Sequence, residues 1–138
     1  MDTAWTDWEA MLAINLRATV ACSRAVLPRM LARGTGSIVH LASLAALGPG
    51  PGQAAYSASK AAVLSFSESL AAECKEHGVR VNAVLPGTMD TPQNREWMSA
   101  ADRARAVDLD AVAEMITFLV SDAARAVTGA AIRVTGKQ

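Results

Sequence analysis

Apolar residues recur along the chain with two alternating periods, which predict helices and strands in turn. The first long apolar pattern predicts a helix over about residues 7 to 33. Thr6 should be its N-cap, with Glu9 completing a capping box. Pro28 lies inside the pattern and should bend or interrupt the helix, and Gly34 should end it.

Short apolar runs bounded by turn residues predict strands between the helices. The expected strands are Ser37–Ala42, Val79–Leu85 and Ala131–Val134; the expected later helices are Gln53–Glu76 and Leu109–Val120, the last with Asp108 as N-cap. Residues 88–107 are polar and predict a loop with a short helical turn. Helices alternating with buried strands predict an α/β fold, with helices on both faces of a parallel sheet.

Composition narrows the classes of function. The chain is 51% hydrophobic with zero formal net charge, so we expect one globular domain without a nucleic-acid or membrane partner. Arg, Ser, Glu or Pro breaks each apolar stretch, so no segment should span a bilayer, and the first residues lack a secretory signal. Cys22 and Cys74 are expected to be small buried hydrophobes in a reducing cytosol, and His40 and His77 lack metal-ligand spacing. We therefore expect a cytoplasmic protein without a metal site.

Tyr56 and Lys60 are the candidate chemistry. They are four residues apart at the start of a predicted helix, so they should project from one face. An ammonium beside a phenol favours the phenolate, which makes Tyr56 a candidate general acid/base. Taken alone, such a pair is more often an ordinary surface contact. The neighbouring segments change that balance.

Other polar features follow predicted strands. Ser43 comes at the end of the first strand, and the segment from Pro86 to Thr91 follows the second. Ligands of open parallel sheets bind outside the carboxyl ends of the strands. We therefore expect Ser43, Tyr56 and the segment 86–91 to meet at one edge of the sheet.

Five segments in order resemble the carboxyl-terminal part of the short-chain dehydrogenase/reductase family. They are Ile14-Asn15-Leu16, Gly36–Ser43, the Tyr56-Ser-Ala-Ser-Lys60 motif, Val79–Gly87, and Phe118–Asp122 continuing to Thr128-Gly129. Any one of them is a weak signal, but together they cover nearly the whole chain. The resemblance implies a partial Rossmann-type, doubly wound parallel sheet that lacks its N-terminal strands.

The resemblance also implies roles for individual residues. Tyr56 would be the acid/base, Lys60 would bind the nicotinamide ribose and assist Tyr56, and Ser43 would hold the substrate oxygen. Asn15 would position a water in a proton relay. The residues implied to line the nicotinamide are Pro86, Gly87, Met89 and Thr91. The implied activity is hydride transfer between NAD(P)(H) and a small carbonyl or alcohol, with the NAD or NADP preference undefined.

The resemblance begins in the middle of the family's usual domain. Residues 1–138 would be its carboxyl-terminal part, without the N-terminal half that binds the dinucleotide phosphates. The stretch 90–102 is similar to dihydropteridine-reductase-like members, and the ending is similar to 3-oxoacyl-carrier-protein-reductase-like members. Members of the family commonly self-associate, so the resemblance implies a homo-oligomer. The alternative is a catalytically inactive remnant that acts as an oligomerisation or interaction module.

Overall fold

The structure is a computed structural model that describes residues 3–48 and 50–137. Three parallel strands form one sheet in the order β1-β2-β3. In chain order the elements are α1 (Trp5–Met11), the π-helical segment η1 (Leu12–Arg17), α2 (Ala18–Arg33), β1 (Gly36–Leu41), the 3-10 turn η2 (Leu44–Ala46), α3 (Ala54–Cys74), η3 (Lys75–His77), β2 (Val79–Pro86), α4 (Pro92–Arg95), α5 (Ala100–Arg105), α6 (Leu109–Val120), η4 (Asp122–Ala124) and β3 (Ala131–Val134).

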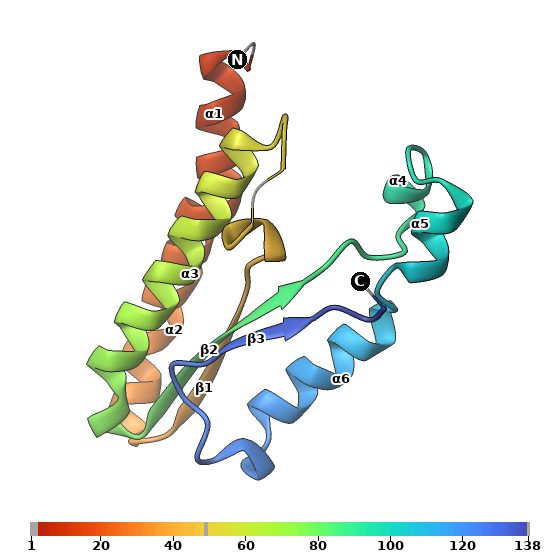
Figure 1. Cartoon of the computed structure of the whole chain (residues 1–138). Helices are drawn as coiled ribbons and strands as arrows, with labels where there is room; N and C mark the ends of the chain where they lie inside the picture. The colour runs from red at the N-terminus through yellow and green to blue at the C-terminus, as the bar shows by residue number, and fades with distance from the viewer. Residues whose placement is uncertain (1–2, 49, 138) are drawn as a thin grey trace.

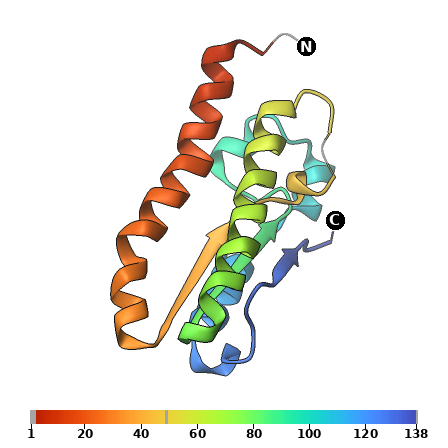
Figure 2. The same ribbon diagram turned by 90° about the vertical axis from the view of Figure 1, so that its left-hand side faces the viewer.

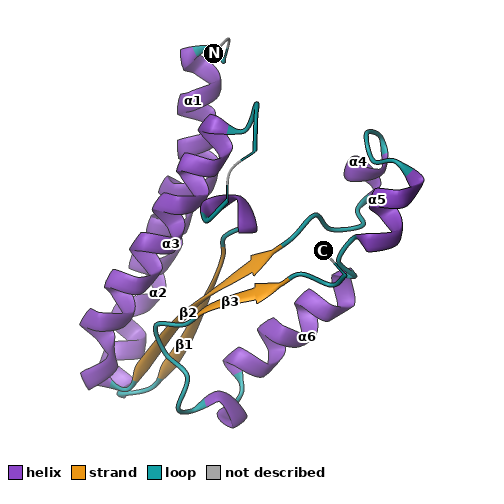
Figure 3. Cartoon of the chain, viewed as in Figure 1, coloured by secondary structure: helices purple, strands orange, loops and turns teal. Residues whose placement is uncertain are grey.

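Helices cover both faces of the sheet (Figure 1). Turning the molecule by 90° shows α2 and α3 side by side on one face (Figure 2). On that face Ile38, Val79 and Val81 pack against Leu70 and Cys74. On the other face α6 contributes Val112 and Leu119 to a core around Val84. The α/β architecture and the three strands predicted from the apolar pattern are confirmed, with strand bounds within one residue (Figure 3).

Glycines end two of the elements as predicted. Gly34 adopts φ 65° after α2, and Gly78 adopts φ 72° before β2. At Gly78 an added Cβ would lie 2.2 Å from the Gly34 carbonyl oxygen, so the two turns can pack together only without a side chain there. Asp108 caps α6 as predicted, accepting the Asp110 N–H at 3.1 Å.

The first helix differs from expectation at its start. The predicted capping box was wrong: Ala4 is the N-cap, and no side chain caps the helix. Because the helix begins at Trp5, Thr6 already has a place in the first helical turn and cannot serve as the cap.

Pro28 does not interrupt the first helix. Helical residues run from Trp5 to Arg33, and the irregularity lies instead in the π-helical segment Leu12–Arg17. Pro28 cannot donate to the carbonyl of Arg24, but both residues are exposed, so water can satisfy that carbonyl.

One further expectation about this helix was wrong. Cys22 is exposed, at an open cavity between α2 and β1, whereas Cys74 is buried as expected. By length and composition alone, the 29-residue helix Trp5–Arg33 is long and apolar enough to cross a membrane. Of its most apolar 18-residue stretch, 6% is buried. A mostly buried core helix of a soluble protein and a signal sequence near the N-terminus pass the same test, so the expectation that no segment spans a bilayer stays a prediction.

Candidate active site

The first turns of α3 place Tyr56 and Lys60 side by side. The Lys60 Nζ lies 5.9 Å from the centroid of the Tyr56 ring. It donates a 2.8 Å hydrogen bond to the Leu41 carbonyl oxygen at the end of β1. The helical spacing therefore brings the two side chains together as predicted, and the strand end anchors the ammonium.

Lys60 is half-buried in this position. Burial disfavours its charged form, which lowers the pKa of Lys60 below the usual value for lysine. A lysine with a lowered pKa gives up its proton more readily. That property suits a group placed beside a candidate acid/base.

Ser43 lies beyond the end of β1, where it is the N-cap of η2. Its hydroxyl oxygen accepts the Ala45 N–H at 3.2 Å. A serine hydroxyl carries one proton as well as its lone pairs, so this bond leaves Ser43 a donor. The turn fixes the position of the oxygen without using its proton.

Ser43 and Tyr56 meet at a cavity of about 340 Å³ at the carboxyl edge of the sheet. Ser43 and Tyr56 line it together with Pro86, Gly87 and Met89, which follow β2. The edge predicted from the parallel strand order is therefore where the side chains converge. Three segments far apart in sequence supply one site.

Three predicted site residues lie outside the lining of this cavity. Lys60 is held behind Tyr56 by its bond to Leu41. Thr91 is the N-cap of α4, where its side chain accepts the Asn94 N–H at 3.1 Å. Asn15 lies in the π-helical segment and reaches α3 instead.

One hydrogen bond joins Asn15 to the helix that carries Tyr56, and a second bond within that helix continues to Tyr56. The Asn15 side-chain Nδ2 donates to the Ser59 Oγ at 2.9 Å, and that hydroxyl donates to the Tyr56 carbonyl oxygen at 2.7 Å. The structure thus brings Asn15 to the turn between Tyr56 and Lys60. Its role in a water relay stays a prediction.

Among the lining residues that sequence reasoning missed, three carry polar or aromatic side chains outside the predicted segments. They are Gln53, Asn94 and Trp97. The Asn94 side chain donates to the Met89 carbonyl oxygen at 2.9 Å and so holds the loop after β2. Trp97 is 66% exposed, and a large exposed aromatic in a polar loop is the one signal that could have indicated a binding surface.

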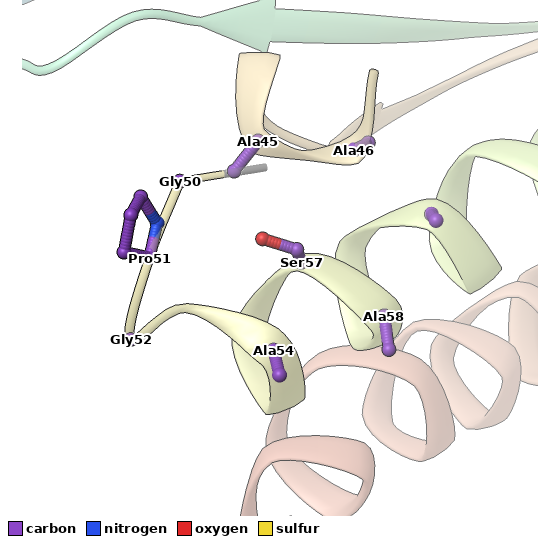
Figure 4. Close-up of a pocket in the computed structure, with 9 residues that line it drawn as sticks. Ala45, Ala46, Gly50, Pro51, Gly52, Ala54, Ser57 and Ala58 are labelled. Carbon is purple, nitrogen blue, oxygen red and sulfur yellow. The ribbon is translucent and has the colours of Figure 1, made fainter. Parts of the chain in front are cut away.

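A larger cavity, of about 700 Å³, lies between η2, the loop 50–52 and the start of α3 (Figure 4). Its lining is mostly alanine, glycine and proline, and none of the predicted site residues contributes to it. The Ser57 hydroxyl is buried without a hydrogen-bond partner and is the polar group of this lining. None of the described residues that line this cavity has a titratable side chain, so we place the candidate chemistry in the smaller cavity.

Comparisons with known proteins identify the family of the chain. The family described as enoyl-(acyl carrier protein) reductase matches residues 1–136. Galactitol 2-dehydrogenase of Rhizobium johnstonii is 40% identical over 146 residues, covering 96% of this chain and 56% of the relative. The 3-oxoacyl-[acyl-carrier-protein] reductase of Thermotoga maritima is 34% identical, covering 94% of this chain and 56% of the relative.

A solved structure from Beutenbergia cavernae, assigned as an NAD(P)-dependent gluconate 5-dehydrogenase with NADP at low occupancy, superposes with a TM-score of 0.91. It is 34% identical and covers 98% of this chain and 58% of that one. The chain thus spans little more than half the length of the proteins that it matches. Nearly all of its length matches members of one family, and the chain belongs to the short-chain dehydrogenase/reductase family.

Proposed function

We propose that this chain carries the catalytic residues of an NAD(P)-dependent oxidoreductase that interconverts a small carbonyl and an alcohol. The observation that supports it best is the convergence of Ser43, Tyr56 and the segment Pro86–Met89 on one cavity, with Lys60 beside Tyr56. Dehydrogenase and reductase relatives support the same class of reaction.

The donor set around the cavity fits the nicotinamide end of the cofactor. The cavity has room for a small ring system and is lined by Gly87 and Met89 along one wall. Lys60 and the Tyr56 hydroxyl supply polar groups suited to ribose hydroxyls. When bound, the cofactor supplies the hydride chemistry.

The chain's own residues would handle the proton. In the reductive direction Tyr56 gives its hydroxyl proton to the substrate oxygen, and in the oxidative direction it takes that proton back. The Lys60 ammonium favours the phenolate left on Tyr56. Ser43 donates a hydrogen bond to the same substrate oxygen and stabilises the negative charge that develops there.

Tyr56→Phe tests this assignment. We expect turnover to fall by at least ~10²-fold, because the proton donor is removed, while nicotinamide binding persists because the ring remains. The measurement is oxidation of NADH and NADPH in the presence of a panel of small ketones and aldehydes. It uses a fusion protein in which this chain is extended to the full length of its relatives.

Ser65→Ala is the matched control, since Ser65 is exposed on the same helix and should leave turnover unchanged. Turnover by Tyr56→Phe at the wild-type rate would remove Tyr56 from the acid/base role.

A second candidate is an inactive module for self-association or for pairing with a longer relative. Two observations favour it: within the described residues β1 pairs with β2 alone, so its other edge is open, and the helix Trp5–Arg33 presents apolar side chains such as Ile14 to solvent. Absence of turnover in the fusion, together with a stable oligomer, would favour this alternative.

A further inference from the structure

A line of hydrogen-bonded polar side chains runs along the packing of the first helix against α3. We call it the polar seam. Its members on the first helix recur every fourth residue, and so lie on one face; α3 and β1 supply the others. The seam consists of Asn15, Thr19 and Ser23, of His40 on β1, and of Ser59 and Ser67 on α3.

His40 connects the two helices at one end of the seam. Its Nε2 lies 2.9 Å from the Ser23 Oγ on α2, and its Nδ1 lies 2.7 Å from the Ser67 Oγ on α3. The residue is buried, and its ring stacks on Phe66 at 5.5 Å between centroids. One imidazole on the strand therefore bonds to both helices that carry candidate site residues.

Each of the two serine hydroxyls also has a partner on its own helix. Ser23 donates to the Thr19 carbonyl oxygen at 2.8 Å, and Ser67 donates to the Val63 carbonyl oxygen at 2.7 Å. Each hydroxyl therefore offers a lone pair to the ring. A neutral imidazole has one N–H, so it donates to one serine and accepts from the other after that hydroxyl turns. In either arrangement the ring keeps a bond to each helix.

The other end of the seam is the contact made by Asn15. The Thr19 hydroxyl donates to the Asn15 carbonyl oxygen at 2.6 Å, and the Asn15 side chain reaches Ser59. Asn15 and Ser23 are eight residues apart, which is about 12 Å along a helix. The two helices are thus fastened at two points, one beside Tyr56 and one at His40.

We propose that His40 is a positioning residue for the candidate active site. By bonding Ser23 and Ser67, it fixes the register of the first helix against α3 and so keeps Asn15 against the turn that holds Tyr56 and Lys60. His40 also precedes Leu41, whose carbonyl anchors Lys60. That these residues form an active site rests on the proposed function, but the position of Asn15 against α3 can be measured without turnover.

A mutant cycle tests whether His40 transmits between the helices. Ser23→Ala and Ser67→Ala each remove one hydroxyl. In the wild type each of these hydroxyls contacts the His40 ring and a carbonyl oxygen of its own helix. If the ring joins them, their effects on the unfolding equilibrium constant should depart from additivity by at least about twofold. In a His40→Phe background, which keeps an aromatic ring against Phe66, the effects should be additive.

A second readout follows the site itself. In the NMR spectrum of the full chain, the side-chain amide of Asn15 should shift in His40→Phe and in Ser67→Ala. Ser67→Ala replaces no aromatic ring, so a shift in that variant reports a changed helix register. Ser65→Ala, an exposed serine two residues before Ser67, should leave the resonance in place.

Additive effects of the two serine substitutions in the wild-type background would overturn the proposal. An Asn15 amide that stays fixed in Ser67→Ala would also overturn it, since core packing alone predicts lost stability without movement at Asn15. If His40→Phe does not fold, the serine cycle and the Asn15 resonance decide the question. None of these results depends on oxidoreductase activity.

Discussion

The two long helices on the same face of the sheet differ in burial. α3 buries nine of its residues, among them Leu64 and Leu70. The helix Trp5–Arg33 buries Ser23 alone, and Ile14 is 71% exposed. The core therefore fixes the part of the site on α3. The first helix adds half-buried Leu16, Leu27 and Met30 to that core, and the polar seam bonds Asn15 to α3.

The difference also teaches what hydropathy can and cannot predict. An apolar helical pattern predicts a helix that is covered by something, but not what covers it. For α3 the cover is the sheet, through β2. For the first helix much of the apolar side faces solvent in this chain, which spans just over half the length of its relatives.

The largest expected effect is a difference in stability between two matched substitutions, one in each helix. Leu70→Ala should lower the free energy of unfolding by ~2–5 kcal/mol, because it leaves a cavity in the core under α3. Ile14→Ala should change it by less than ~0.5 kcal/mol, because Ile14 is already in water. Urea denaturation measures both. A large loss in Ile14→Ala would mean that the first helix is covered in solution, and would break the comparison.

The seam should add a smaller, pH-dependent effect. Burial lowers the pKa of His40, so the unfolded chain takes up a proton more readily than the folded one. The stabilisation from neutral His40 is then complete above the ordinary histidine pKa of about 6.5 and is lost as pH falls through the lowered folded value.

His40→Phe sharpens this prediction. Urea midpoints measured from about pH 8 to about pH 5 should fall less steeply with acid in the variant than in the wild type. Equal slopes in the two proteins would show that His40 does not titrate in this way. A wild-type protein that becomes more stable in acid would contradict the sign.

The periodicity of the chain was sufficient to predict the fold. Each strand follows from a short β-branched run between turn residues, and β3 has the predicted bounds Ala131–Val134. The site was also predictable where it depends on local spacing or strand ends, as at Tyr56, Lys60 and Ser43.

The remainder could not be predicted, because it depends on contacts between distant residues. His40 lies 17 residues from Ser23 and 27 from Ser67, and no local pattern links them. The π-helical segment around Asn15 carries no glycine or proline to announce it. Thr91 lies near the cavity in sequence, but its side chain caps α4, a short helix inside a stretch predicted as mostly irregular.

The most direct test of the account is binding of the two halves of the cofactor to the 138-residue chain. We predict that reduced nicotinamide mononucleotide binds saturably, with a change in its fluorescence, and that Lys60→Met weakens this binding. AMP should not compete, since the proposed contacts at this cavity are with the nicotinamide side of the cofactor. Folded protein that fails to bind the reduced mononucleotide, or that binds it equally well after Lys60→Met, would contradict the proposed site.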